Sequence, residues 1–139
     1  MADAMEVDGR GESGGGERLD GLMTNLARGR IAVGLAALAV PKLTVRLMGL
    51  GSGADAGRDY LVRAFGAREI ALGAGYLLSG DDSGRRLWTR LGLAVDTLDV
   101  LSAAKTRPGL PLWVTAGAVG IAGGAAGIGA AKTARDLLG

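Results

Sequence analysis

The longest uncharged stretch of the sequence, residues 109 to 131, contains no Asp, Glu, Lys or Arg over 23 positions. A helix rises about 1.5 Å per residue, so this stretch can cross a bilayer core of about 30 Å. A helix on the surface of a soluble protein keeps a polar face, whereas WVTAGAVGIAGGAAGIGAA has none. Its glycines would also weaken a helix in water. The stretch therefore predicts a membrane-spanning helix.

Three further apolar segments precede this one, and each of them carries charged residues. The loops GSGADAG, GDDSGRR and TRPGLP separate the segments. We therefore predict an all-α, four-helix transmembrane bundle of up-down topology with spans at about 24–40, 58–79, 86–105 and 109–131. Whether the first segment continues past Pro41 through KLTVRLMGL stays open, because proline disrupts a helix interior.

The start of the chain differs in composition from the rest. MADAMEVDGRGESGGGERLDG is acidic, rich in glycine and nearly free of large apolar side chains. Such a segment cannot bury enough surface to offset its chain entropy. We expect residues 1–22 to form a disordered tail and residues 23–137 to form the transmembrane domain.

The distribution of Lys and Arg predicts the orientation of the bundle. Cytoplasmic loops carry an excess of these residues, and counting them favours both termini on the cytoplasmic side. Tyr60, Tyr76, Trp88 and Trp113 would fall near span ends, where aromatic belts form. Arg outnumbers Lys thirteen to three, which indicates a GC-rich bacterial genome. We expect a multi-pass protein of the bacterial cytoplasmic (inner) membrane.

The lack of cysteine and histidine excludes several kinds of metal site and catalytic site. The chain has no Cys and no His, which excludes disulfides, zinc and iron–sulfur sites, and catalysis through a Ser-His or Cys-His pair. No metal site and no cofactor is predicted. Aromatic residues do not alternate with basic ones, so nucleic acid is not an expected partner.

Four charged residues lie inside the predicted spans and form the main candidate site. Arg68 and Glu69 lie near the middle of the second span, and Asp96 and Asp99 share one face of the third. A short loop makes these spans antiparallel, which puts Arg68 and Asp99 at similar depth, where the geometry allows them to pair. One positive charge faces three negative ones, and Lys42 could reduce the deficit. Otherwise desolvation and like charges favour a neutral form for at least one carboxylate.

Two interpretations of this cluster remain open. Ionisable residues inside a membrane are candidates for binding a cation, relaying protons or holding a polar head group. The alternative is a buried polar clamp that fixes the register of the helices.

Glycines in the last segment follow the spacing of close helix packing. Gly120 with Gly124, and Gly123 with Gly127, form two overlapping GxxxG patterns, and Gly117 precedes them. A dinucleotide-binding interpretation requires a preceding strand, which the sequence does not predict. The segment is therefore expected to form either the core of the bundle or the face of a homo-oligomer.

Several loose motifs resemble a known group of proteins. Arg30-x-x-x-Gly34 precedes Pro41-Lys42-Leu43, GARE lies in the second span, and D-x-x-D lies in the third. Over residues 28 to 131 this pattern resembles small four-span bacterial membrane proteins of the DoxX-like group. The resemblance implies a four-helix membrane bundle, in some members linked to membrane oxidoreductase complexes or quinone-coupled thiol chemistry. It would place Arg30, Gly34 and Lys42 in a motif of the first span, and it adds Arg30 to the candidate residues of the charged cluster.

Three functions follow as hypotheses. The first is a non-enzymatic accessory or structural subunit of a membrane complex, with lipid and other membrane proteins as its partners. The second is a small transporter or proton-coupled carrier that uses Glu69, Asp96 and Asp99. The third is a membrane enzyme or oxidoreductase-associated subunit that acts on a lipid or quinone.

Overall fold

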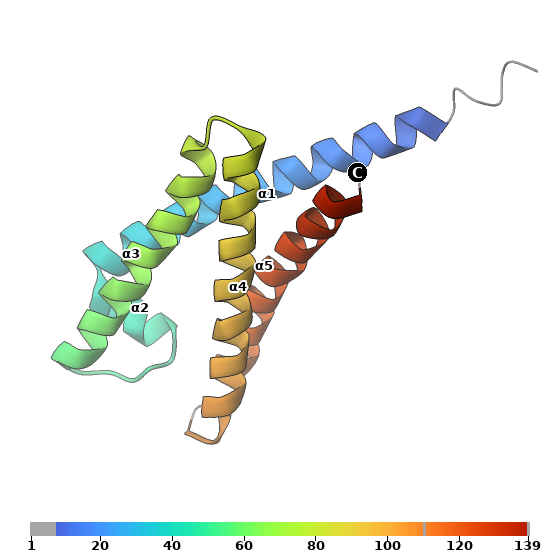
Figure 1. The fold of residues 1–139 in the computed structure, drawn as a ribbon. Coiled ribbons are helices and arrows are strands. Elements are labelled where there is room, and N and C mark those ends of the chain that lie inside the picture. Colours follow the sequence, from blue (N-terminus) through green and yellow to red (C-terminus); the bar gives the residue numbers. More distant parts are fainter. Residues whose placement is uncertain (1–7, 110, 139) are drawn as a thin grey trace, which may run out of the picture.

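The structure of the chain, a computed structural model, describes residues 8–109 and 111–138, and over these residues it is all-helical (Figure 1). The all-α prediction is confirmed. The long helices α1, α3, α4 and α5 correspond to the four apolar segments. The elements are α1 (Asp8–Ala39), α2 (Pro41–Leu47), α3 (Ala56–Leu78), α4 (Asp82–Thr106), the 3-10 turn η1 (Arg107–Gly109) and α5 (Leu112–Leu138).

The long helices pack in two pairs. α1 packs mainly on α3, and α4 packs mainly on α5, with fewer contacts between the pairs. Figure 1 shows the chain reversing direction from one long helix to the next. The first half of α1, the connection between α3 and α4, and the end of α5 therefore lie at one end of the bundle. The connections on either side of the α3–α4 hairpin lie at the other end.

The first segment does continue past Pro41, as a separate short helix. Val40 leaves the helical region with φ −131° and ψ 60°, and Pro41 stands in the first turn of α2. Proline has no N–H to donate, so it suits a first helical turn and cannot continue the preceding one. This break sends α2 back along α3, where Val45 is buried.

The N-terminal segment differs from the expected disordered tail. Residues 1–7 lie outside the described residues, but α1 begins at Asp8 and includes the rest of this segment. Its second half contacts the end of α5: Asp20 pairs with Lys132 at 2.9 Å, and the guanidinium of Arg135 lies against Gly16. The prediction weighed only the apolar surface of the segment itself, whereas contacts with a distant helix order it.

Aspartates begin α3 and α4. Asp55 accepts the backbone N–H of Arg58, and Asp81 accepts that of Gly84, both at 2.8 Å. These hydrogen bonds lower the pKa of each carboxyl below its usual value. Because Asp81 caps α4, the helix starts at Asp82, four residues before the predicted span.

The core consists of two apolar clusters with charged residues between them. One contains Met23, Ala27 and Tyr76, with Trp88 packed against it. The other contains Ala37, Val45 and Val62. Arg30 on α1 and Glu69 on α3 lie between these two clusters along their helices.

Candidate functional site

A close crossing of α1 and α3 positions the site. A Cβ atom built on Gly66 would lie 2.7 Å from the carbonyl oxygen of Gly34 and 2.9 Å from the Cβ of Ala37. One heptad away, Gly73 lies against the carbonyl oxygen of Ala27. These small residues let the two backbones approach, as in many membrane helix pairs. Between the two contacts each helix carries one buried charged residue, Arg30 on α1 and Glu69 on α3.

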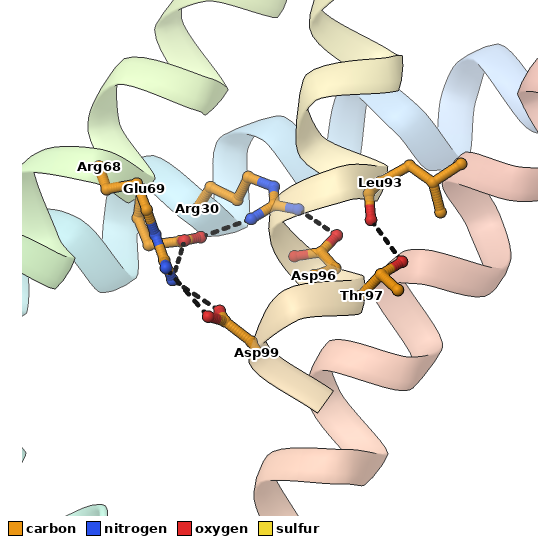
Figure 2. Close-up of polar contacts among 7 residues, drawn as sticks. All are labelled: Arg30, Arg68, Glu69, Leu93, Asp96, Thr97 and Asp99. Carbon is orange, nitrogen blue, oxygen red and sulfur yellow. Dashed lines mark hydrogen bonds and ion pairs between the residues drawn. The ribbon is translucent and has the colours of Figure 1, made fainter. Parts of the chain in front are cut away.

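Arg30 is the centre of the cluster. Its Nη1 donates to Glu69 at 2.7 Å, and its Nη2 donates to Asp96 at 2.5 Å (Figure 2). The three side chains are each less than one tenth exposed. Breaking a buried pair of this kind leaves a charge without compensation. One arginine therefore ties α1 to both α3 and α4.

Arg68 forms a second arm of the cluster. Its Nη1 and Nη2 donate to the two carboxylate oxygens of Asp99 at 3.0 and 2.7 Å, and Nη2 also reaches Glu69 at 3.2 Å. The guanidinium lies over the Phe65 ring, 4.8 Å from its centroid. The expected Arg68–Asp99 pair is thus present. Unlike Arg30, it lies at the edge of the bundle, with 34% of Arg68 and 35% of Asp99 exposed.

The structure changes the charge count of the cluster. Two arginines, not one, face the three carboxylates, so one excess negative charge remains. Lys42, which was expected to reduce the deficit, is exposed on α2 and makes no ion pair with a described residue. Pro41 causes this difference, because the break at Val40 starts a new helix axis.

Sequence spacing could have identified Arg30 as a buried residue. From Met23 onward, the buried positions of α1 follow a repeat of four and three residues: Met23, Ala27, Arg30, Gly34 and Ala37. Apart from Leu72, the buried positions of α3 follow the same repeat: Val62, Gly66, Glu69, Gly73 and Tyr76. A 3.5-residue repeat of small and apolar residues marks a helix-packing seam. Arg30 occupies that seam, so the pattern predicts an inward-facing arginine.

Five glycines of α5 lie apart from the helix contacts. A Cβ atom built on any of these five would meet no other described residue within 4 Å: Gly117, Gly120, Gly123, Gly124 and Gly127. α5 instead packs on α4 through Gly129, where an added Cβ would lie 3.3 Å from that of Leu93. The GxxxG glycines therefore do not form the core of the bundle within one chain. A self-association face remains a prediction.

The space beside the cluster is small. A cavity of about 20 Å³ lies among Arg30, Asp96, Tyr76 and Thr89, which is room for one water molecule. Thr97, drawn near the cluster in Figure 2, donates to the carbonyl of Leu93 within its own helix. Besides bordering this cavity, the cluster is exposed at Arg68 and Asp99, which lie at the edge of the bundle.

A second polar group, which the sequence did not single out, lies at the end of the bundle near the start of α4. Lys132 bridges Asp20 at 2.9 Å and Asp136 at 3.0 Å. Arg86 lies 3.9 Å from Asp136. This group joins α1, α4 and α5, and its members come from segments predicted as tail, loop and helix end.

Comparisons with protein-family models, with curated proteins and with solved structures find no match. The resemblance to the DoxX-like group therefore stays a prediction.

Proposed function

We propose that the chain is a multi-pass membrane protein with an accessory or structural role, whose Arg30-centred cluster locks the helices together. Support comes first from α5, the one helix in the described part of the chain that is long and apolar enough to cross a membrane. Only Val114, Thr115, Ala125 and Gly129 of this helix are buried. A soluble protein would bury its most apolar helix, whereas α5 is largely exposed, as expected for lipid contact.

Two of the other long helices, α3 and α4, support the same environment. On α3, Arg68 and Glu69 are the only charged residues between Arg63 and Asp81. On α4, Asp96 and Asp99 are the only ones between Arg90 and Lys105. All four belong to the cluster. Charges that pair with one another on otherwise uncharged stretches of helix are typical of a polytopic membrane protein.

The pairing of the charges within the cluster favours a structural role. Arg30 binds two carboxylates from two other helices, and the adjoining cavity has room for one water molecule. A transporter would require a wider aqueous path to the carboxylates. The buried Glu69–Arg30–Asp96 bridge is therefore the main support for a structural role.

Membrane extraction tests the location. The protein is expected to stay in the membrane pellet after washing at high salt and alkaline pH, and to enter solution only with detergent. Recovery in the supernatant without detergent would contradict a multi-pass arrangement.

Reconstitution into liposomes tests the structural role. Purified protein is expected to leave an imposed pH gradient as stable as empty liposomes do, because the cavity beside Asp96 has room for about one water molecule. Gradient collapse that disappears in Asp96→Asn but persists in Asp82→Asn would favour the proton-coupled carrier instead.

The exposed arm of the cluster gives the lipid or quinone hypothesis a specific observation. Arg68 and Asp99 are about one third exposed at the edge between α3 and α4, where a polar lipid group or quinone oxygen could reach Arg68. Co-purification of a quinone with the protein, lost in Arg68→Gln and kept in Arg63→Gln, would favour this function over the structural one.

A further inference from the structure

The end of the bundle contains a polar pocket that is separate from the cluster. It has a volume of about 110 Å³ and is lined by residues from four helices. Three are cations, namely Arg85, Arg86 and Lys132, and three are carboxylates, namely Asp20, Asp82 and Asp136. The pocket therefore presents both signs of charge in equal number.

Some of the charged residues that line the pocket already have ion-pair partners. Lys132 is held between Asp20 and Asp136, and Arg86 contacts Asp136 only at 3.9 Å. Arg85 and Asp82 make no ion pair with any other residue that the structure describes. The groups left to bind a ligand are thus two arginine side chains and one carboxylate, at the start of α4.

Tyr76 adds a neutral hydrogen-bond donor to the lining of the pocket. It lines the pocket, it is 6% exposed, and its hydroxyl makes no hydrogen bond to another described residue. A tyrosine hydroxyl usually has a partner when the ring is buried. A ligand oxygen in the pocket would supply one.

The position of the pocket favours a lipid head group as its ligand. Lys132 is the first charged residue after the uncharged run of α5, and Trp88 packs against Gly75 beside Tyr76. Trp and Tyr concentrate where the membrane core meets water, at the depth of lipid head groups. This step rests on the membrane location proposed above.

We propose that this pocket binds a zwitterionic head group in which an ammonium lies a few bonds from a phosphate, as in phosphatidylethanolamine. Arg85 and Arg86 bind the phosphate, and Tyr76 donates its hydroxyl to a phosphate oxygen. Asp82, with Asp20 beside Lys132, accepts hydrogen bonds from the ammonium. Arginine suits phosphate because its planar guanidinium can donate two parallel hydrogen bonds.

Native mass spectrometry in mild detergent with added phosphatidylethanolamine, phosphatidylcholine or phosphatidylglycerol tests the proposal. Phosphatidylethanolamine is expected to bind most tightly. Phosphatidylcholine has no ammonium N–H to donate, and phosphatidylglycerol has no cation for Asp82. The Arg85→Gln/Arg86→Gln variant should lose about tenfold or more in affinity. Asp82→Asn should remove the preference over phosphatidylglycerol.

Arg90→Gln is the matched control, since Arg90 is exposed on the same helix and does not line the pocket. Equal binding of the three lipids, or equal loss in Arg90→Gln and the double variant, would overturn the proposal. A further experiment adds water-soluble glycerophosphoethanolamine as a competitor of the lipid. Displacement of the lipid would show that the pocket recognises the head group alone. It can also be tested on protein that proves soluble, so a wrong membrane location and a wrong ligand give different results.

Discussion

Arg30 connects three helices through one side chain. It lies on α1 and donates to Glu69 of α3 and Asp96 of α4, and all three groups are buried. Arg68 also pairs with carboxylates, but its hydrogen bonds to Asp99 lie at the edge of the bundle and not in its interior. We therefore expect the two arginines to differ in their contribution to stability.

Replacing Arg30 should destabilise the bundle more than any other single charge change. Arg30→Met strands two buried carboxylates, and loss of one partner from a buried pair costs roughly 3 to 5 kcal/mol. Thermal unfolding in detergent should show a much lower midpoint. Arg28→Met is the control, because Arg28 is exposed on the same helix. Similar midpoints for the two variants would show that the Arg30 bridge does not hold the helices together.

The Arg68–Asp99 pair should behave as a coupled unit. Arg68→Gln and Asp99→Asn each remove one partner of a bidentate contact, so each should destabilise, though less than Arg30→Met because the pair is partly exposed. The double variant should cost less than the sum of the two single variants, with a coupling energy of about 0.5 to 3 kcal/mol. Strict additivity in a double-mutant cycle would contradict the pairing.

At the scale of elements, small residues decide how the helices meet. Gly34 and Gly66 bring α1 and α3 together, and this contact lies one helical turn from Arg30 and Glu69. The glycines with the clearest GxxxG spacing lie on α5, and a Cβ atom added to any of them would have no other described residue within 4 Å. Identical residues thus have different roles, which depend on the face that each helix turns toward its neighbour.

Glycine substitutions should separate these roles. Gly66→Ala puts a Cβ 2.7 Å from the Gly34 carbonyl, and such overpacking typically costs 1 to 3 kcal/mol, so the unfolding midpoint should fall. Gly120→Ala is the matched control. It meets open space, and alanine favours a helix over glycine by up to about 1 kcal/mol, so the midpoint should hold or rise. A fall with Gly120→Ala, together with loss of a dimer, would instead indicate self-association through α5.

At the scale of the molecule, four long helices and their connections define two ends. The α3–α4 connection lies at the same end as the first half of α1 and the end of α5. Positive residues such as Arg85, Arg86 and Lys132 gather at that end. Positive charge near span ends favours the cytoplasmic side, so this end is expected to face the cytoplasm.

Single cysteines can test that orientation, because the natural chain contains none. With Ser52→Cys, in the connection before α3, an impermeant maleimide should label intact spheroplasts. With Ser83→Cys, at the start of α4, labelling should require permeabilised cells. The reverse pattern would invert the bundle, and equal access of both positions in intact cells would contradict a spanning arrangement.

Local hydropathy and helical spacing were enough to predict the helical class, the end of α1, the approximate limits of the other three long helices and a pair between Arg68 and Asp99. The break at Pro41 was also visible in the residue type, though not its consequence for Lys42. Only the tertiary structure decided which arginine lies at the centre of the cluster, since Arg30 reaches Glu69 and Asp96 through the close crossing of α1 and α3. The same holds for the contacts of the first half of α1 with Lys132 and Arg135, which lie more than a hundred residues away. Contacts between distant segments leave no mark in local composition.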